Sequence, residues 1–199
     1  IHAYAPTFDA IPVTPPPPYN VTGGQPQTMV AVLTDTHVGE RVSLNQMSGL
    51  NDYDLGIFSR RLSGWTQQVL NLAMYRRNIC DVDELVIPML GDMVSGDIHE
   101  ELSRSNIDNC MIQMLSASHL IAQALMYLAP NFKSIRIPCV VGNHGRMTKK
   151  PPMKDKYMDW DYLTYQWIAA FCKNQSNITF TIPKSFAQII EVCGRKILL

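Results

Sequence analysis

Hydrophobic residues follow two patterns along the chain: short apolar runs, and longer stretches in which apolar positions recur every three or four residues. Three of the runs predict strands, at 29–34 (MVAVLT), 84–90 (ELVIPML) and 134–141 (SIRIPCVV). The unbroken run at 29–34 is typical of a central strand covered on both faces. Pro88 removes one backbone donor from the second run, which favours an edge or irregular position there.

Between and after these runs, the apolar positions have the period of amphipathic helices. One stripe comprises Phe58, Leu62, Trp65, Val69 and Leu72, a longer one comprises Ile107, Met111, Met114, Ser118, Ile121, Leu125 and Leu128, and a shorter one comprises Trp160, Leu163, Trp167 and Phe171. We expect each stripe to face the core, with both methionines as packing residues.

Three further strands are predicted near the end of the sequence, at 178–182, 187–192 and 196–199. Strands and helices alternate before them, so the pattern predicts an α/β domain, and the closing run of strands indicates a second sheet. The Pro- and Gly-rich residues 1–27 lack periodic apolar content, so we expect an extended arm or linker there and a folded domain over 28–199.

Composition narrows the class of protein without choosing a function. The 199 residues are 46% hydrophobic and 17% charged, which suits one domain with a core. Lys and Arg together number 17, as do Asp and Glu, so the net charge gives no sign of a nucleic-acid or membrane partner. The five cysteines are widely spaced and form no Cys-x-x-Cys pair, which predicts reduced thiols. With no signal peptide and no run of 18 apolar residues, we expect a soluble, cytoplasmic protein.

The first three predicted strands each end in polar residues that could bind metal ions. The first runs into Asp35-Thr36-His37, the second into Gly91-Asp92, and the third into Gly142-Asn143-His144. Ligands of open α/β sheets bind beyond the carboxyl ends of the strands, so these three motifs predict one shared site.

The side chains in these motifs suit a site for two metal ions. On an extended backbone, Asp35 and His37 would point to the same side and bind one cation. Asp92 could bridge two ions and Asn143 could bind the second, which leaves His144 to stabilise the transition state or protonate the leaving oxygen. Two ions about 3.5 to 4 Å apart can polarise a phosphoryl oxygen and hold an activated water in line for attack.

Each of these residues also has an ordinary structural explanation when it is taken alone. Asp35 could cap a turn or a helix, His37 could be a surface histidine, and Asp92 and Asn143 could be turn residues. Only the three motifs together, in this order, favour the metal site.

The blocks DTHVG, GDMVSGD and GNHGR resemble, in order and spacing, the first three signature blocks of the calcineurin-like metallophosphoesterases. The resemblance is to the branch that includes repair exonucleases and phage-type phosphoesterases, and it spans residues 29–199. It implies a two-sheet β-sandwich flanked by helices around a binuclear centre that usually holds manganese, iron or zinc. By this resemblance Asp35 and His37 bind the first metal, Asp92 bridges, Asn143 binds the second and His144 is catalytic.

The sequence departs from the family pattern in two places. Gly145 stands where the family often has an acidic residue that orients the catalytic histidine, so another group must hold His144. The family also has metal-binding histidines in later blocks, whereas no histidine follows His144 in the sequence to Leu199. We therefore expect the N-terminal portion of such a domain, which holds the first metal better than the second.

The stretch RMTKKPPMKDK, which follows the third motif, is basic and could attract a polyanion. Arg146 is the best candidate in it for a phosphate contact, because its guanidinium matches phosphate oxygens. A solvated loop is the plain alternative, and the acidic stretch 81–108 argues against a continuous DNA track.

Two classes of function follow from the sequence. The first is a metal-dependent phosphoesterase that hydrolyses a phosphodiester, either nucleic acid such as DNA or a small phosphate ester. The second is a non-catalytic binding or assembly module that keeps the fold with an incomplete metal centre.

Overall fold

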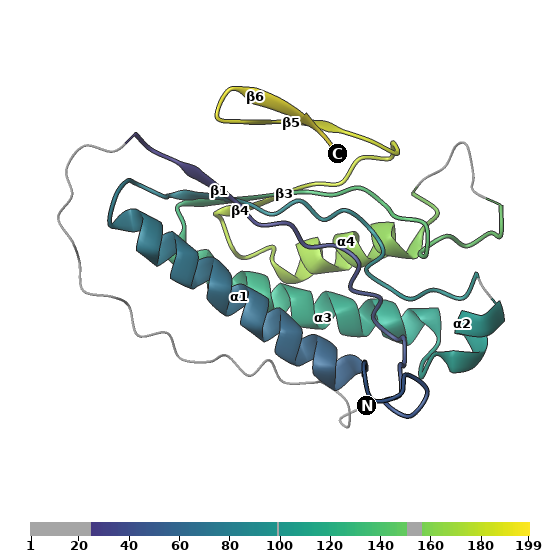
Figure 1. Cartoon of the computed structure of the whole chain (residues 1–199). Coiled ribbons are helices and arrows are strands. Elements are labelled where there is room, and N and C mark those ends of the chain that lie inside the picture. The colour runs from purple at the N-terminus through teal and green to yellow at the C-terminus, as the bar shows by residue number, and fades with distance from the viewer. Residues whose placement is uncertain (1–24, 99, 151–156) are drawn as a thin grey trace.

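Four parallel strands form the main sheet, in the order β1-β2-β3-β4 (Figure 1). They are β1 (Thr28–Val30), β2 (Glu84–Val86), β3 (Ser134–Pro138) and β4 (Ile178–Thr181). Met29, Leu85, Ile135 and Ile178 are in register across the sheet. Because parallel neighbours need crossover connections, a helix lies between each pair of consecutive strands, and the predicted α/β class is confirmed.

The structure is a computed structural model that describes residues 25–98, 100–150 and 157–199, without the side chains of 101–103. The predicted arm therefore lies outside the described residues, except for its last three positions. The helices are α1 (Leu55–Arg77), α2 (Glu100–Ser105), α3 (Cys110–Leu128), the short 3-10 helix η1 (Ala129–Asn131) and α4 (Trp160–Phe171).

Polar residues begin the three long helices. The side chains of Asp54, Asn109 and Asp159 accept hydrogen bonds from backbone N–H groups in the first turn of α1, α3 and α4 respectively. Each bond satisfies a donor that has no partner within the helix.

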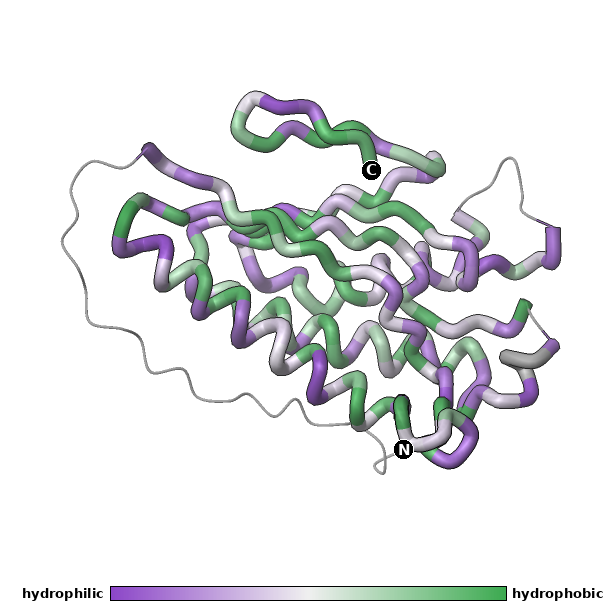
Figure 2. The backbone as a smooth tube through the Cα atoms, viewed as in Figure 1, coloured by the Kyte–Doolittle hydropathy of each residue, from purple (hydrophilic) through white to green (hydrophobic). Residues whose placement is uncertain are grey.

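Helices α1, α3 and α4 lie on one face of the main sheet, and the core lies between them and the strands (Figure 1). Figure 2 shows that the strands of this sheet are largely hydrophobic, whereas α1 alternates between hydrophobic and hydrophilic residues. The largest fully buried side chains include Leu85, Ile135 and Ile137 of the sheet, together with Leu120 and Leu125 of α3.

A hairpin of β5 (Ile189–Val192) and β6 (Arg195–Leu198) forms a second, antiparallel sheet on the opposite face (Figure 1). The Arg136 guanidinium donates to the Glu191 carbonyl, and the Gln188 amide donates to the Cys139 carbonyl. The predicted second sheet is thus confirmed for the last two strands, whereas the first of the three predicted strands joins the main sheet as β4.

The two expectations about strand positions have different outcomes, and the one for β1 is wrong. β1 lies at the edge of the sheet, and its segment alternates: Ala31 and Leu33 are buried, whereas Val30 and Val32 are 44% and 46% exposed. β2 lies between β1 and β3, so it is no edge strand. Pro88 falls after its last residue, where only isolated bridges continue the ladder, so the irregular position, the other alternative for Pro88, is confirmed.

The helical stripes are predicted correctly in part. Phe58, Leu62 and Val69 of α1 are buried, but Leu72 is exposed because the buried face continues through Leu70 and Ala73. In α3, the stripe members Met114, Ser118, Ile121, Leu125 and Leu128 are buried, as predicted. Met111 is 61% exposed and Ile107 precedes the helix, so neither is a core residue.

The prediction of which face of α4 is buried is wrong. Trp167 and Phe171 are exposed and pack against each other, with ring centroids 5.9 Å apart. The buried face is instead formed by Asp161, Thr164, Tyr165 and Ile168. Polar groups thus point into the protein from this helix.

Among the described residues, one helical stretch, Cys110–Asn131, is long and apolar enough to cross a membrane by length and composition. More than half of its most apolar window is buried inside the protein, which is usual for a core helix. The five cysteines are free, and four of them are buried.

A polar ladder crosses the face of the sheet that carries the hairpin. Glu84 accepts hydrogen bonds from Thr28 (2.7 Å) and Arg136 (2.6 Å), and the bond from Arg136 is the main reason that the pKa of Glu84 is lowered. A lowered folded-state pKa means that this stabilisation is present above the unfolded-state pKa and is lost as the pH falls through the folded-state pKa.

We expect Glu84→Gln to lower the free energy of unfolding by less than about 1 kcal/mol at neutral pH, because the pair is partly exposed. The difference from the parent should shrink as the pH falls below the unfolded-state pKa of a glutamate, and it should disappear only below the lowered folded-state pKa, where the carboxyl is protonated in both states. Urea unfolding of the parent, Glu84→Gln, Arg136→Gln and the double variant checks this. A difference that persists unchanged to low pH would contradict it.

Candidate metal centre

The polar motifs after β1 and β2 lie side by side because the two chain segments continue to pair beyond the strands. Backbone N–H groups of Leu33, Asp35 and His37 donate to carbonyls of Pro88, Gly91 and Asp92. This pairing brings His37 beside Asp92.

The motif after β3 is joined to the same place by the Asp92 carboxylate. Its Oδ1 accepts hydrogen bonds from the backbone N–H groups of Asn143 (2.8 Å) and His144 (2.7 Å). Asp92 therefore connects the second and third motifs, and the three predicted motifs converge at one edge of the sheet.

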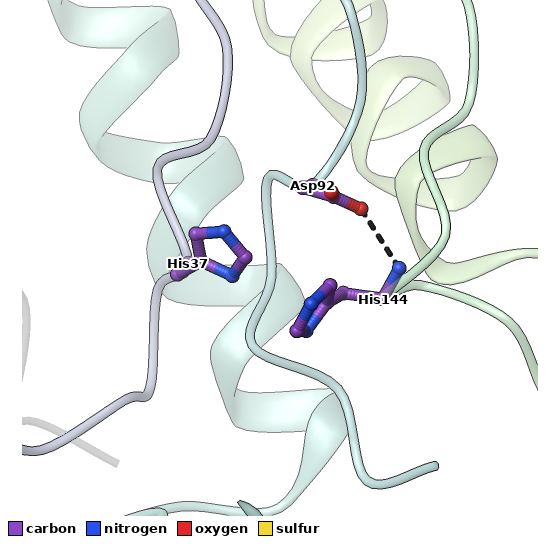
Figure 3. Close-up of side chains that lie close together, drawn as sticks. All are labelled: His37, Asp92 and His144. Atoms are coloured by element: carbon purple, nitrogen blue, oxygen red, sulfur yellow. Dashed lines mark hydrogen bonds between the residues drawn. The ribbon is translucent and has the colours of Figure 1, made fainter. Parts of the chain in front are cut away.

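His37, Asp92 and His144 form the centre of the candidate site (Figure 3). Each offers one ligand atom, and these atoms lie within 4.8 Å of one another. The two imidazole rings meet edge to face, with centroids 4.5 Å apart and planes at 85°. Two imidazoles and a carboxylate form a donor set that divalent transition metals favour.

His37 provides a separate indication that the site fits a metal ion. Its Nδ1 is buried and has no hydrogen-bond partner within the part of the chain that the structure describes. A buried polar atom without a partner is costly, and coordination of a cation would remove that cost.

The backbone around Asp35 and His37 differs from the extended form that we expected. Asp35 has φ 53° and His37 has φ 41°, both in the left-handed region, and Asp92 has φ 54°. The two side chains still meet, because Asp35 Oδ1 lies 3.7 Å from His37 Nε2. Left-handed conformations are unfavourable for residues with a Cβ, and their concentration at candidate ligands is typical of functional sites.

The group that holds His144 is the backbone carbonyl of Ser95, which lies 3.0 Å from Nδ1. With the proton on Nδ1 donated to this carbonyl, the lone pair is on Nε2. An acidic residue at position 145 would not fit, because a Cβ on Gly145 would lie 2.2 Å from Asp159 Oδ1.

Two predicted residues lie at the margin of this cluster. The Asn143 side chain is exposed, and the residue is tied to the site through its backbone N–H. Arg146 pairs with Asp159 through the backbone, and its Nε is buried without a partner among the described residues. Lys149 and Lys150 are exposed, whereas Lys154 and Lys156 lie outside the described residues.

Sequence reasoning missed Asp161, the residue that holds the loops together. Its buried carboxylate accepts hydrogen bonds from the backbone N–H groups of Asp92 (2.8 Å), Met93 (2.8 Å) and Gly142 (3.0 Å). Burial raises the pKa of Asp161, and these three donors act in the opposite direction. One carboxylate thus fixes the two loops that carry Asp92 and His144.

Tyr165, one turn further along α4, was also missed, because it lies on the buried face of α4 that the hydrophobic pattern did not predict. Its hydroxyl accepts from the Gly91 N–H (3.0 Å) and donates to the Val140 carbonyl (2.9 Å). Burial raises its pKa well above the ordinary value, so the phenol keeps the proton that it donates. The sequence did contain one signal for these two residues: an acidic side chain and a hydroxyl four residues apart, which places both on one face of a helix.

Gly91 allows the loops after β2 and β3 to approach each other. Its φ is +90°, and a Cβ there would lie 2.1 Å from the backbone nitrogen of Gly142. We expect Gly91→Ala to lower the free energy of unfolding by about 3 kcal/mol, from the left-handed backbone and the clash together.

Gly49→Ala is the matched control for this prediction. Gly49 has φ +80°, but nothing lies within 4 Å of a Cβ built there, so its substitution should cost only about 1 kcal/mol. Chemical denaturation measures both. Equal losses would mean that the close approach of the two loops contributes nothing.

The arrangement can hold a divalent cation between His37, Asp92 and His144, with Asp35 beside it. Comparison of the chain with protein-family models, with curated proteins and with solved structures finds no match in any of the three. The function must therefore be argued from the site itself.

Proposed function

We propose that this protein is a metal-dependent phosphoesterase that hydrolyses a phosphodiester, built on a two-sheet fold of the metallophosphoesterase type. The observation that carries the proposal is the convergence of His37, Asp92 and His144 within 4.8 Å from three separate chain segments. The motif resemblance supports the same conclusion independently of the geometry.

The proposed cofactors are two divalent ions, with manganese as the first choice and iron or zinc as alternatives. When bound, such ions polarise a phosphoryl oxygen and make water a better nucleophile at neutral pH. Asp35, His37 and Asp92 would hold the first ion, and Asp92 and Asn143 the second. The pairing of Asp35 with His37 at 3.7 Å supports the first of these groups.

His144 is the proposed proton donor to the leaving oxygen. Its ring is oriented by the Ser95 carbonyl at 3.0 Å from Nδ1, a contact that suits both the neutral and the protonated imidazole. This fixed orientation directs Nε2 as a proton-transfer group without help from an acidic side chain at position 145.

The proposed substrate is a nucleic acid, DNA in the first place. Arg146 is the proposed phosphate contact, because its buried Nε has no partner among the described residues and a guanidinium pairs well with phosphate. A cytoplasmic location is proposed from the five free thiols, which suit a reducing compartment.

A second candidate function is a non-catalytic binding module that keeps one metal ion. The exposed side chain of Asn143 favours it, since a second ion would have few protein ligands within the described residues. The two functions differ in one measurable respect: both bind metal, but only the first turns over a phosphodiester.

The test is hydrolysis of a chromogenic phosphodiester, and of single- and double-stranded DNA, by protein stripped with a chelator and titrated with manganese. We expect activity that is absent after stripping and saturates with added manganese. Binding of manganese by calorimetry with no hydrolysis of any substrate would favour the binding module. Absence of both binding and hydrolysis would overturn both proposals.

A further inference from the structure

We infer that a cavity next to Asp35 binds the planar aromatic group of a phosphodiester, a nucleobase, while the phosphate lies at the metal centre. The inference rests on the proposed function and specifies its substrate. The cavity has a volume of about 260 Å³ and lies between the segment that follows β1 and the first half of α1. Its walls include Leu33, Tyr53, Phe58, Leu62 and Trp65.

The cavity adjoins the candidate metal centre through one shared residue. Asp35 lines the cavity, and its Oδ1 also lies 3.7 Å from Nε2 of His37. A phosphate held beside His37 and Asp92 would therefore have its next substituent at the mouth of this cavity. In a nucleic acid, the substituent on each phosphate is a nucleoside.

The walls provide aromatic surface on an apolar floor. Leu33, Phe58 and Leu62 are at most 7% exposed and form the floor, whereas Trp65 and Tyr53 are half-buried and keep ring surface accessible. The Arg61 guanidinium carbon lies 5.3 Å from the centroid of the Tyr53 ring. Aromatic rings and guanidinium planes are the groups on which bases stack.

The backbone at the edge of the sheet distinguishes a base from an alkyl group. Backbone N–H groups of Ala31, Leu33 and Asp35 donate toward β2 and the loop that follows it, so those of Val32 and Thr34 point away from the sheet. Val32 and Thr34 both line the cavity. A base presents donors and acceptors along its edge that can pair with such groups, whereas an alkyl chain cannot.

The size of the cavity limits what enters it. Pockets for drug-sized ligands measure about 300 to 1,000 Å³. At about 260 Å³ this cavity suits one ring system, so a single base of the substrate would enter and the rest of the strand would remain outside.

The test compares thymidylyl-thymidine with the same dinucleotide in which one or the other base is replaced by hydrogen. For the parent, removal of the bound base should lower kcat/KM about ten- to hundredfold, the usual effect of one stacked base. Trp65→Leu should cut the activity on the intact dinucleotide to the level of the abasic one, and Trp65→Phe should restore most of it. Trp167→Leu, at an exposed tryptophan of α4, is the control and should behave as the parent does.

A second measurement does not depend on turnover. Thymidine 5′-monophosphate should quench the tryptophan fluorescence of the parent and of Trp167→Leu, and the quenching should disappear in Trp65→Leu. Equal hydrolysis of intact and abasic dinucleotides by the parent would overturn the inference and leave the proposed function standing. If no dinucleotide is hydrolysed, the quenching alone decides the base site: loss of quenching in Trp65→Leu supports it, and quenching that is absent or unaffected by that substitution overturns it. The proposed function is decided separately, by the chromogenic phosphodiester and DNA.

Discussion

Replacing Asp161 with alanine is expected to lower the free energy of unfolding by about 3 to 5 kcal/mol. It should also abolish metal binding at the proposed ligands Asp35, His37 and Asp92. The carboxylate is fully buried and is the acceptor for three backbone N–H groups, those of Asp92, Met93 and Gly142. Alanine would leave all three donors without it, and the Met93 N–H would lose its acceptor at a buried position.

The same substitution would also free the two loops of the site to move relative to each other. Asp92 and Gly142 belong to different loops, and Asp161 holds both through one oxygen, Oδ2. His144 follows Gly142 by two residues, so its ring would no longer be fixed relative to Asp92. Thermal and urea unfolding measure the stability, and calorimetry with manganese measures the binding.

Two variants make this prediction specific to the three bonds. Asp161→Asn keeps an oxygen for Asp92 and Gly142 but turns an amide N–H toward Met93, so its cost should be smaller, about 1 to 3 kcal/mol. Asp54→Ala removes a helix-capping aspartate that accepts one bond, from Ile57, and should cost about 1 kcal/mol. If Asp161→Ala costs no more than Asp54→Ala, the carboxylate does not hold the loops.

The failure to predict Asp161 shows where hydropathy misleads. In WDYLTYQWIAAF the most hydrophobic stripe runs through Trp160, Leu163, Trp167 and Phe171, and pattern reasoning assigns that stripe to the core. The structure buries the more polar stripe, because the loops after β2 and β3 present backbone N–H groups that need acceptors. Tertiary hydrogen bonding thus overrides the hydrophobic pattern on this helix.

Prediction was more successful for the strands and for the convergence of the motifs. Apolar runs identified all six strands that the described residues contain, although only β2 and β3 are largely buried. The position of β1 at the edge was missed because the order of strands depends on contacts far apart in sequence. A continuous apolar run does not encode whether its second face is covered.

The candidate site was predictable in its residues but not in its backbone. The ends of parallel strands meet at one edge of a sheet, so the proximity of His37, Asp92 and His144 follows from topology. The left-handed conformations of Asp35, His37 and Asp92 do not, because a residue with a Cβ adopts them only where its surroundings hold it there. The Ser95 carbonyl that orients His144 could not be predicted either, because every residue has a backbone carbonyl and the sequence does not show which one will contact the ring.

Asp92→Asn is expected to lower the affinity for manganese, and kcat/KM for a phosphodiester, by at least about 100-fold each. The substitution is nearly isosteric. An asparagine carbonyl oxygen can still accept from the N–H groups of Asn143 and His144, as Oδ1 of Asp92 does. What disappears is the negative charge, together with the second oxygen that could bind an ion.

The fold should therefore survive while the site fails, and stability should change by no more than about 1 kcal/mol. Asp97→Asn, at an exposed carboxylate five residues further along, is the control and should alter neither affinity nor activity.

His144→Ala completes the set of variants. If it removes activity but leaves manganese affinity intact, His144 is the proton donor; if affinity falls as it does in Asp92→Asn, the imidazole binds the ion itself. Unchanged affinity in Asp92→Asn would mean that the cluster of His37, Asp92 and His144 holds no metal, and the phosphoesterase proposal would fail with it.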